Sequence, residues 1–161
     1  MNQIVLEILS LSSVQELAGD KEWIQLDQVL EQILDQYKVL AQSRSLTIDN
    51  QIPAKLVYMD PAILKLVLSN VISNAVKHSD AGGEIQLRLE SEGTHLAVEN
   101  TSQEMVETAE MPMTASRQKK EGGLGLFVVQ HLLDHEELAY QFDKTAMGLR
   151  FCMELPKESQ E

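Results

Sequence analysis

The segment between Asp60 and Ser79 is predicted to form a long helix that has a broad apolar face and one polar stripe. At about 100° per residue, the stripe is formed by four side chains that fall within one wedge of the helix: Asn70, Asn74, Lys77 and His78. The apolar residues Leu64, Val67, Leu68, Val71, Ile72 and Ala75 lie mainly to one side of it. A helix with such a face is normally buried, so the chain must build a core around it.

The side-chain amides at the border of this apolar face need hydrogen-bonding partners, because burying them unpaired is costly. Mg²⁺ together with a nucleotide phosphate would meet that need, with amide oxygen on the metal and amide nitrogen and lysine ammonium on phosphate oxygens. A helix with a polar edge whose amides cap neighbouring loops would explain the same stripe. The stripe alone does not decide between these two interpretations.

About fifty residues downstream, a glycine-rich segment leads directly into an apolar helical run; it consists of Gly122, Gly123, Leu124 and Gly125. Exposed N–H groups at the start of a helix, together with the helix dipole, bind anions well. Taken alone, such a cluster is equally a flexible hinge before a helix. The amide stripe followed by two alternating strands and then this glycine segment is a much stronger indication of a phosphate site than either motif alone.

Between about Leu56 and Pro156 the sequence resembles the catalytic, ATP-binding domain of sensor histidine kinases, a fold shared with type II topoisomerases and MutL. Asn70–Ser79 resembles the N box of that family, and Gly123-Leu-Gly-Leu126 resembles its second glycine box. The strand Leu96–Ser102 occupies the place of the first glycine box. The pattern of elements indicates an α/β two-layer sandwich with one mixed sheet and about three helices.

The resemblance implies Mg²⁺ and ATP or ADP as ligands. It places Asn74 on the Mg²⁺ ion that bridges the phosphates, and Asn70 either shares the metal or meets a phosphate. It gives Lys77 a phosphate contact. His78 stands where the family often has a tyrosine that flanks the nucleotide, and a solvated histidine at the helix end is the alternative.

Asn100 is the main departure from the family pattern. The first glycine box usually begins with an aspartate that accepts a hydrogen bond from the adenine amino group. An asparagine still accepts through its amide oxygen, but without charge assistance. Ser102 and Glu104 replace the two glycines of the box, and only glycine adopts positive φ without steric cost. We therefore expect adenine binding to differ from that of the family.

The segment 101–122 corresponds to the ATP lid of the family and has few apolar anchors, so we expect a mobile loop. Arg117, Lys119 and Lys120 are its candidates for closing on the phosphates. Solvated loop charges are the alternative interpretation of these three residues.

Residues 1–20 read as the end of a dimerisation helix hairpin, and residues 21–161 as the catalytic domain. The apolar stripe of the first segment, at Val5, Ile8 and Leu9, fits either an intersubunit bundle or docking on its own domain. No phosphoacceptor is expected here, because His135 lacks the proline that follows the family's acceptor. The partners implied are a phosphoacceptor bundle outside this fragment and a response regulator, in a full-length homodimer.

The formal charge is −12, from 13 basic and 25 acidic residues. Such a surface repels phosphodiester backbones and anionic lipid, which argues against nucleic-acid or membrane-surface binding. The single Cys152 permits no internal disulfide and fits a reducing cytosol. No segment has the roughly 20 apolar residues of a membrane span, so we expect a cytoplasmic domain of a longer protein that is membrane-anchored.

Strands are expected at 23–26, 46–52, 56–59, 85–89, 96–98, 138–142 and 149–155. Helices are expected at 2–18, at 27–41 with Asp27 as its cap, from Pro61 to before Gly82, and at 124–134. Two other functions stay open at this point. One is a degenerate nucleotide-binding or interaction module of the same fold, and the other is an anti-sigma-type serine kinase.

Overall fold

The computed structural model describes residues 20–102 and 123–156 of the chain. In sequence order its elements are β1 (Glu22–Gln25), α2 (Leu26–Gln36), α3 (Lys38–Ser43), β2 (Thr47–Asn50), β3 (Leu56–Met59), α4 (Pro61–His78), β4 (Glu84–Glu90), β5 (His95–Thr101), α6 (Gly123–His135), β6 (Tyr140–Lys144) and β7 (Gly148–Glu154). The predicted succession of strands, helices and hairpins is confirmed for these residues. The predicted N-terminal helix and most of the predicted lid lie outside them.

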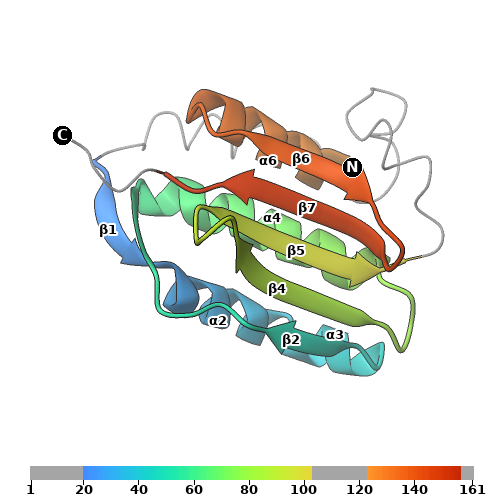
Figure 1. The fold of residues 1–161 in the computed structure, drawn as a ribbon. Helices are drawn as coiled ribbons and strands as arrows, with labels where there is room; N and C mark the ends of the chain where they lie inside the picture. Colours follow the sequence, from blue (N-terminus) through green and yellow to red (C-terminus); the bar gives the residue numbers. More distant parts are fainter. Residues whose placement is uncertain (1–19, 103–122, 157–161) are drawn as a thin grey trace.

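The main sheet has five strands in the order β2-β4-β5-β7-β6. β2 pairs with β4 in parallel, and the other neighbours are antiparallel. Figure 1 shows helices α2, α4 and α6 behind one face of this sheet, so the molecule has two layers. The predicted α/β sandwich with a mixed sheet is confirmed. Beside it, β1 and β3 form a separate antiparallel pair.

Helix α4 runs through the centre of the core, as its apolar face requires. Asp60 caps it, because its carboxylate accepts a hydrogen bond from the N–H of Ala62 at 2.9 Å, and Pro61 occupies the first turn. Its buried residues are Ile63, Leu64, Val67, Leu68, Val71, Ile72, Ala75 and Val76. Within residues 20–102 and 123–156, no helix combines the length and the apolarity that crossing a bilayer requires.

The predicted helix over 27–41 is wrong in its start and its continuity. α2 begins one residue earlier, with Gln25 as an N-cap that makes no side-chain bond. The N–H of Leu26 donates to the carbonyl of Lys55 at 2.8 Å, and the Asp27 carboxylate accepts from the N–H of Lys55 at 3.2 Å. Asp27 therefore binds the backbone of Lys55, just before β3, and does not cap its own helix. At Tyr37 the helix breaks, and α3 follows.

The two faces of the main sheet are chemically opposite. The residues of β4 and β5 that face the helices are apolar and fully or nearly fully buried: Ile85, Leu87, Leu96 and Val98. The alternate residues, which include Arg88 and Glu99, point to the open face. Asn100 follows Val98 at a spacing of two, so its side chain faces the helix layer.

Candidate functional site

The amide stripe of α4 lies against the start of α6 (Gly123–His135) at Gly125. A Cβ atom on Gly125 would stand 3.1 Å from Oδ1 of Asn70, which is tighter than most real contacts. Nδ2 of Asn70 donates to the carbonyl of Leu66, one turn back in α4, at 2.8 Å. The amide nitrogen is therefore used within the helix, while the amide oxygen is turned toward the start of α6. A glycine at position 125 permits this close approach.

A cavity joins the middle of α4 to the end of β5. Residues from four elements that line it are Val71, Asn74, Val98, Asn100, Leu126 and Phe142. Its volume is about 30 Å³, which suits one or two water molecules and is too small for a purine ring. A base that enters here must displace some of the lining side chains. The cavity nonetheless brings together Asn74 and Asn100, which are far apart in sequence.

Asn100 and Ser102 carry polar atoms that are buried without partners. The residues are 5% and 7% exposed, and neither Nδ2 of Asn100 nor Oγ of Ser102 has a hydrogen-bond partner among the described residues. A buried donor left unpaired costs about 1–3 kcal/mol. Such atoms in a native core require an explanation, and a ligand that enters the cavity would provide one for Asn100.

Gly148 fixes the position of this end of β5. A Cβ there would lie 2.2 Å from the carbonyl oxygen of Asn100 and 2.3 Å from the backbone nitrogen of Ser102. No residue other than glycine fits without moving one of the two backbones. A glycine at the start of a strand is a sequence sign of close backbone approach, although the partner segment cannot be read from it.

The last turn of α4 places the two predicted site residues Lys77 and His78 differently. Lys77 is exposed, and His78 is half-buried. Ser79 closes the helix with its hydroxyl donating to the carbonyl of Ala75 at 2.5 Å. The Arg44 guanidinium donates to the carbonyl of Ser79, and the Arg44 carbonyl accepts from the N–H of Gly82 at 2.9 Å. A cation at a helix C-terminus is favourable, so Arg44 stabilises the end of the amide-bearing helix.

Thr101 connects the same helix end to the strand that carries Asn100. The N–H of Asp80 donates to the Thr101 carbonyl at 2.9 Å, and the N–H of Glu84 donates to the Thr101 hydroxyl at 3.1 Å. These bonds join the chain that follows α4 to the residue next to Asn100. Neither Arg44 nor Thr101 was selected from the sequence, because their partners lie in other elements.

Some predicted site residues are not placed. Arg117, Lys119, Lys120 and Gly122 lie outside the described residues, whereas Gly123 and Leu124 form the start of α6. Among the described residues there is no group of three or more histidine, cysteine, aspartate or glutamate side chains suited to a metal. The amide oxygens of Asn70 and Asn74 suit a metal such as Mg²⁺, which takes few protein ligands and most of its oxygens from phosphate and water.

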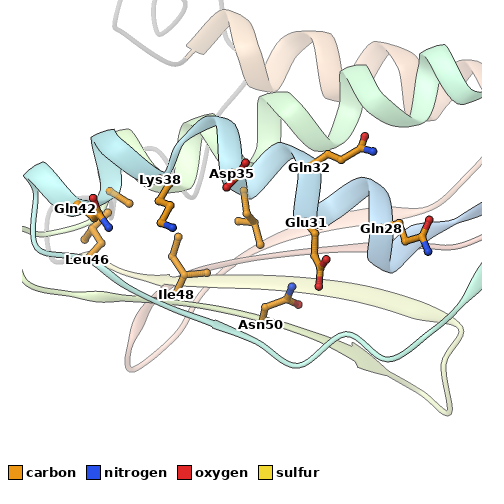
Figure 2. A pocket seen from close by; sticks show the side chains of 11 residues that line it. Gln28, Glu31, Gln32, Asp35, Lys38, Gln42, Leu46, Ile48 and Asn50 are labelled. Carbon is orange, nitrogen blue, oxygen red and sulfur yellow. The ribbon is translucent and has the colours of Figure 1, made fainter.

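A larger hollow lies elsewhere, in the groove between α2, α3 and the edge strand β2 (Figure 2). Its floor includes Leu46 and Ile48, and its rim carries Glu31, Asp35 and Lys38. None of the described polar atoms that are buried without a partner belongs to its lining. The groove is therefore larger than the cavity at Asn74 and Asn100, but it lacks the unmet polar groups that point to a ligand.

Comparison with known proteins agrees with this geometry. Residues 59–159 match the family described as histidine kinase-, DNA gyrase B-, and HSP90-like ATPase. The chain is 32% identical over 164 residues to the sensor histidine protein kinase HK06 of Streptococcus pneumoniae serotype 2 (strain D39 / NCTC 7466). That alignment covers 96% of this chain and 37% of HK06, so the chain spans well under half the length of this relative.

Two solved structures share the fold. The catalytic domain of the histidine kinase ThkA in a nucleotide-free form superposes with a TM-score of 0.73 at 19% identity, over 86% of this chain and 97% of that one. Full-length ShkA in complex with AMPPNP superposes with a TM-score of 0.76 at 22% identity, over 95% of this chain and 35% of ShkA. The chain thus belongs to the histidine kinase-, DNA gyrase B-, and HSP90-like ATPase family, as an ATP-binding catalytic domain of the sensor histidine kinase type.

Proposed function

We propose that this chain binds Mg²⁺ and ATP between α4, α6 and the end of β5, and presents the γ-phosphoryl group to a histidine on a helical bundle outside the described residues. The observation that carries the proposal is the cavity that Asn74 shares with Asn100, whose amide nitrogen is buried and unpartnered. A binding site for a polar ligand explains both the burial of the Asn100 amide and its convergence with Asn74 from a separate element.

In this site the α4 amides hold the metal and the phosphates. Asn74, which lines the cavity, provides an amide oxygen to Mg²⁺, and Asn70 has its Oδ1 turned toward α6 for the same ion or for a phosphate. The exposed ammonium of Lys77 neutralises phosphate charge. A bound Mg²⁺ supplies charge neutralisation on the phosphate oxygens.

Of the remaining predicted site residues, some are proposed to contact the base and the others the phosphates. Asn100, Ser102 and His78 lie at or near the base end of the site, where Asn100 reads the purine. The N–H groups of Gly123, Leu124 and Gly125 at the start of α6 bind phosphate oxygens through the helix N-terminus, and Gly122, which precedes them in the sequence, is proposed to add a further N–H group. Arg117 and Lys119 extend the positive charge from the lid. The chain contributes positioning and electrostatic stabilisation, and little covalent chemistry.

Calorimetry on the 161-residue chain tests the proposal. With the non-hydrolysable analogue AMPPNP, we expect saturable binding in Mg²⁺ that weakens roughly tenfold or more when the metal is chelated. A chain that gives no binding heat with AMPPNP in the presence of Mg²⁺ contradicts the proposal, provided that its thermal unfolding is cooperative.

A second candidate is a module that binds nucleotide without turning it over. It is favoured by Asn100 where the family has aspartate, and by Ser102 where the family has glycine. Both candidates predict binding, so a transfer measurement separates them. With the whole protein, labelled ATP should give an acid-labile phosphohistidine if the kinase proposal holds, and no label if the module only binds.

The wider proposal concerns the whole protein. We assign residues 1–20 to the end of a dimerisation hairpin and residues 21–161 to the catalytic domain, and the acceptor histidine to a bundle that is not part of these 161 residues. The full-length protein is a membrane-anchored homodimer, and its catalytic domain works on the cytoplasmic side. A response regulator then takes the phosphoryl group from the bundle histidine. The support for a longer protein is that about two thirds of the length of HK06 lies outside the match; the anchor, the homodimer and the response regulator follow from the resemblance to sensor histidine kinases.

A further inference from the structure

Asn100 is a side chain of the proposed site whose hydrogen bonds stay incomplete among the described residues. It is 5% exposed, it lines the cavity, and its Nδ2 lacks a partner among the described residues. Its amide carries two N–H donors on one side and an acceptor oxygen on the other. A carboxylate in the same place would offer acceptors only. The Asn100 atom that lacks a hydrogen-bond partner, Nδ2, is therefore a donor. A carboxylate at this position would have no donor.

The backbone of Asn100 cannot shift to change what its side chain meets. It pairs with Leu149 of β7 on one side and with Ile85 of β4 on the other. Gly148 approaches its carbonyl so closely that even a methyl group would not fit between them. The side chain therefore enters the cavity from a fixed position, and only rotation of its amide changes the hydrogen bonds that it offers.

Purine bases present two different edges to a group in this position. Adenine offers its 6-amino donor next to the ring-nitrogen acceptors, and an asparagine amide pairs with such an edge in two hydrogen bonds. Hypoxanthine and guanine offer a 6-oxo acceptor next to an N–H donor. Half a turn of the carboxamide exchanges its oxygen for its nitrogen, so one side chain complements either edge.

We propose that Asn100 makes this a site for purine nucleotides of both the 6-amino and the 6-oxo kind, with weak discrimination between them. The inference rests on the proposed function, because it assumes that the base of a nucleotide enters the cavity of Asn74 and Asn100. In both orientations the amide forms neutral hydrogen bonds of similar strength. Asn100→Asp removes the donor and leaves a charged acceptor, which favours the 6-amino group and repels a 6-oxo group.

The test is calorimetry of the 161-residue chain with ADP and with IDP, both in excess Mg²⁺. These two ligands differ only at the purine 6-position and its neighbouring nitrogen. We expect wild-type dissociation constants within about fivefold of each other. In Asn100→Asp the preference for ADP should rise by about tenfold or more, through tighter ADP and weaker IDP binding.

Asn50→Asp is the matched control, since it makes the same chemical change on β2, away from the cavity. It should leave the ratio of the two dissociation constants unchanged. Wild type that prefers ADP by more than about fivefold overturns the inference even if Asn100→Asp does not fold, because wild type alone decides that point. So does a folded Asn100→Asp whose ratio equals that of wild type.

The failure of the proposed function has a different result. If neither diphosphate binds to folded wild type, the nucleotide site itself is refuted and this inference falls with it. If ADP binds well and IDP does not, the site stands and only the relaxed base choice is refuted.

Discussion

Glu99 and Asn100 are neighbours in β5, are similarly buried at 8% and 5% exposure, and face opposite sides of the same sheet. The Glu99 carboxylate accepts from the Arg88 guanidinium at 3.1 Å and from the Thr145 hydroxyl at 2.6 Å. The Asn100 amide nitrogen has no such partner among the described residues. The hydrogen bonds of the buried Glu99 side chain are therefore satisfied within the protein, whereas the buried Asn100 side chain has a donor without a partner among the described residues.

The rest of the open face follows the pattern of Glu99. Arg88 also pairs with Glu90 at 3.0 Å, and Arg150 pairs with Glu90 and with Asp143. Burial lowers the pKa of Arg150, but the Cys152 thiol and the two carboxylates outweigh it and the pKa is raised. Burial raises the pKa of the Cys152 thiol, which agrees with a packed strand residue. The comparison teaches that a buried polar group points to a ligand only when its partners are missing.

The largest expected effect comes from Gly148, because both faces depend on its contact with β5. In Gly148→Ala the added methyl group meets the backbone of Asn100 and Ser102 at 2.2 and 2.3 Å, so β5 and β7 must separate. We expect a loss of about 3 kcal/mol or more in the free energy of unfolding, at the upper end of overpacking costs. Urea denaturation followed by circular dichroism measures it.

The control for this substitution is Gly82→Ala. Gly82 has a φ of +80° and open space around its Cα, so the cost there is conformational, about 1–2 kcal/mol. An equal loss in both variants would mean that the close approach of Gly148 is not what holds β5 in place.

The fold was predictable where its determinants are local. The cap at Asp60, the proline after it and the apolar period define α4 within one stretch of sequence, and the structure agrees with them. Asp27 shows the opposite case. It has the residue type of a helix cap, but its carboxylate binds the Lys55 backbone, and a contact between distant residues has no local pattern.

The same limit applies to the candidate site. Asn70, Asn74 and the glycines were selected because they form motifs within short segments. Arg44 acts on the carbonyl of Ser79, which is 35 residues away, and Gly148 acts on the backbone near Asn100. The sequence shows an arginine and a turn glycine at these positions, but their partners become known only when the sheet and helix layers are assembled.

Glu99→Gln tests the buried polar residue whose hydrogen-bond partners are within the protein. The amide offers Arg88 a single neutral acceptor in place of a carboxylate, so we expect a loss of about 1–3 kcal/mol in unfolding free energy. Nucleotide affinity should stay within about twofold, because the side chain faces away from the cavity. Glu84→Gln removes the same charge from the open face at a residue without an ion pair to any described residue, and should cost less than about 0.5 kcal/mol. A large loss of ADP affinity in Glu99→Gln would contradict the separation of the two faces.

Asn74→Ala tests the cavity on the helix-covered face, where Asn100 has a donor without a partner among the described residues. We expect Mg²⁺ to strengthen ADP binding in wild type and to have little effect in the variant, a difference of roughly tenfold or more in affinity, or about 1.4 kcal/mol. Calorimetry with and without Mg²⁺ measures it. Ser73→Ala, the neighbouring position on α4, should keep the metal dependence. If Asn74→Ala binds ADP in Mg²⁺ as tightly as wild type, the assignment of the metal to this amide is wrong.

Substitution of Tyr140 gives the smallest expected effect. It tests whether only polar groups without a partner indicate a ligand site, because Tyr140 is a polar residue on the helix-covered face that does have a partner. Its hydroxyl donates to the Asp134 carboxylate at 3.1 Å. Burial, then this hydrogen bond and the nearby negative charge, raise the pKa of Tyr140 from 10.0 to about 12. In the unfolded chain the phenol ionises near pH 10, so between pH 10 and 12 the unfolded state binds fewer protons than the folded state. The stabilisation is therefore complete below pH 10 and is lost as the pH rises toward 12.

The residue is only partly buried, so solvent screens the interaction and the loss of stability should be small. In Tyr140→Phe the fall in stability above pH 10 should become shallower, and absorbance titration of the phenols at 295 nm should lose the component that ionises near pH 12. Asp134→Asn should move that component toward lower pH. Since the hydroxyl is already paired, ADP affinity at pH 7 should be the same in Tyr140→Phe and wild type. A clear loss of ADP affinity in Tyr140→Phe would mean that a polar group with a hydrogen-bond partner in the protein also contributes to ligand binding. The distinction between satisfied and unsatisfied buried polar groups, drawn from Glu99 and Asn100, would then not hold on the helix-covered face.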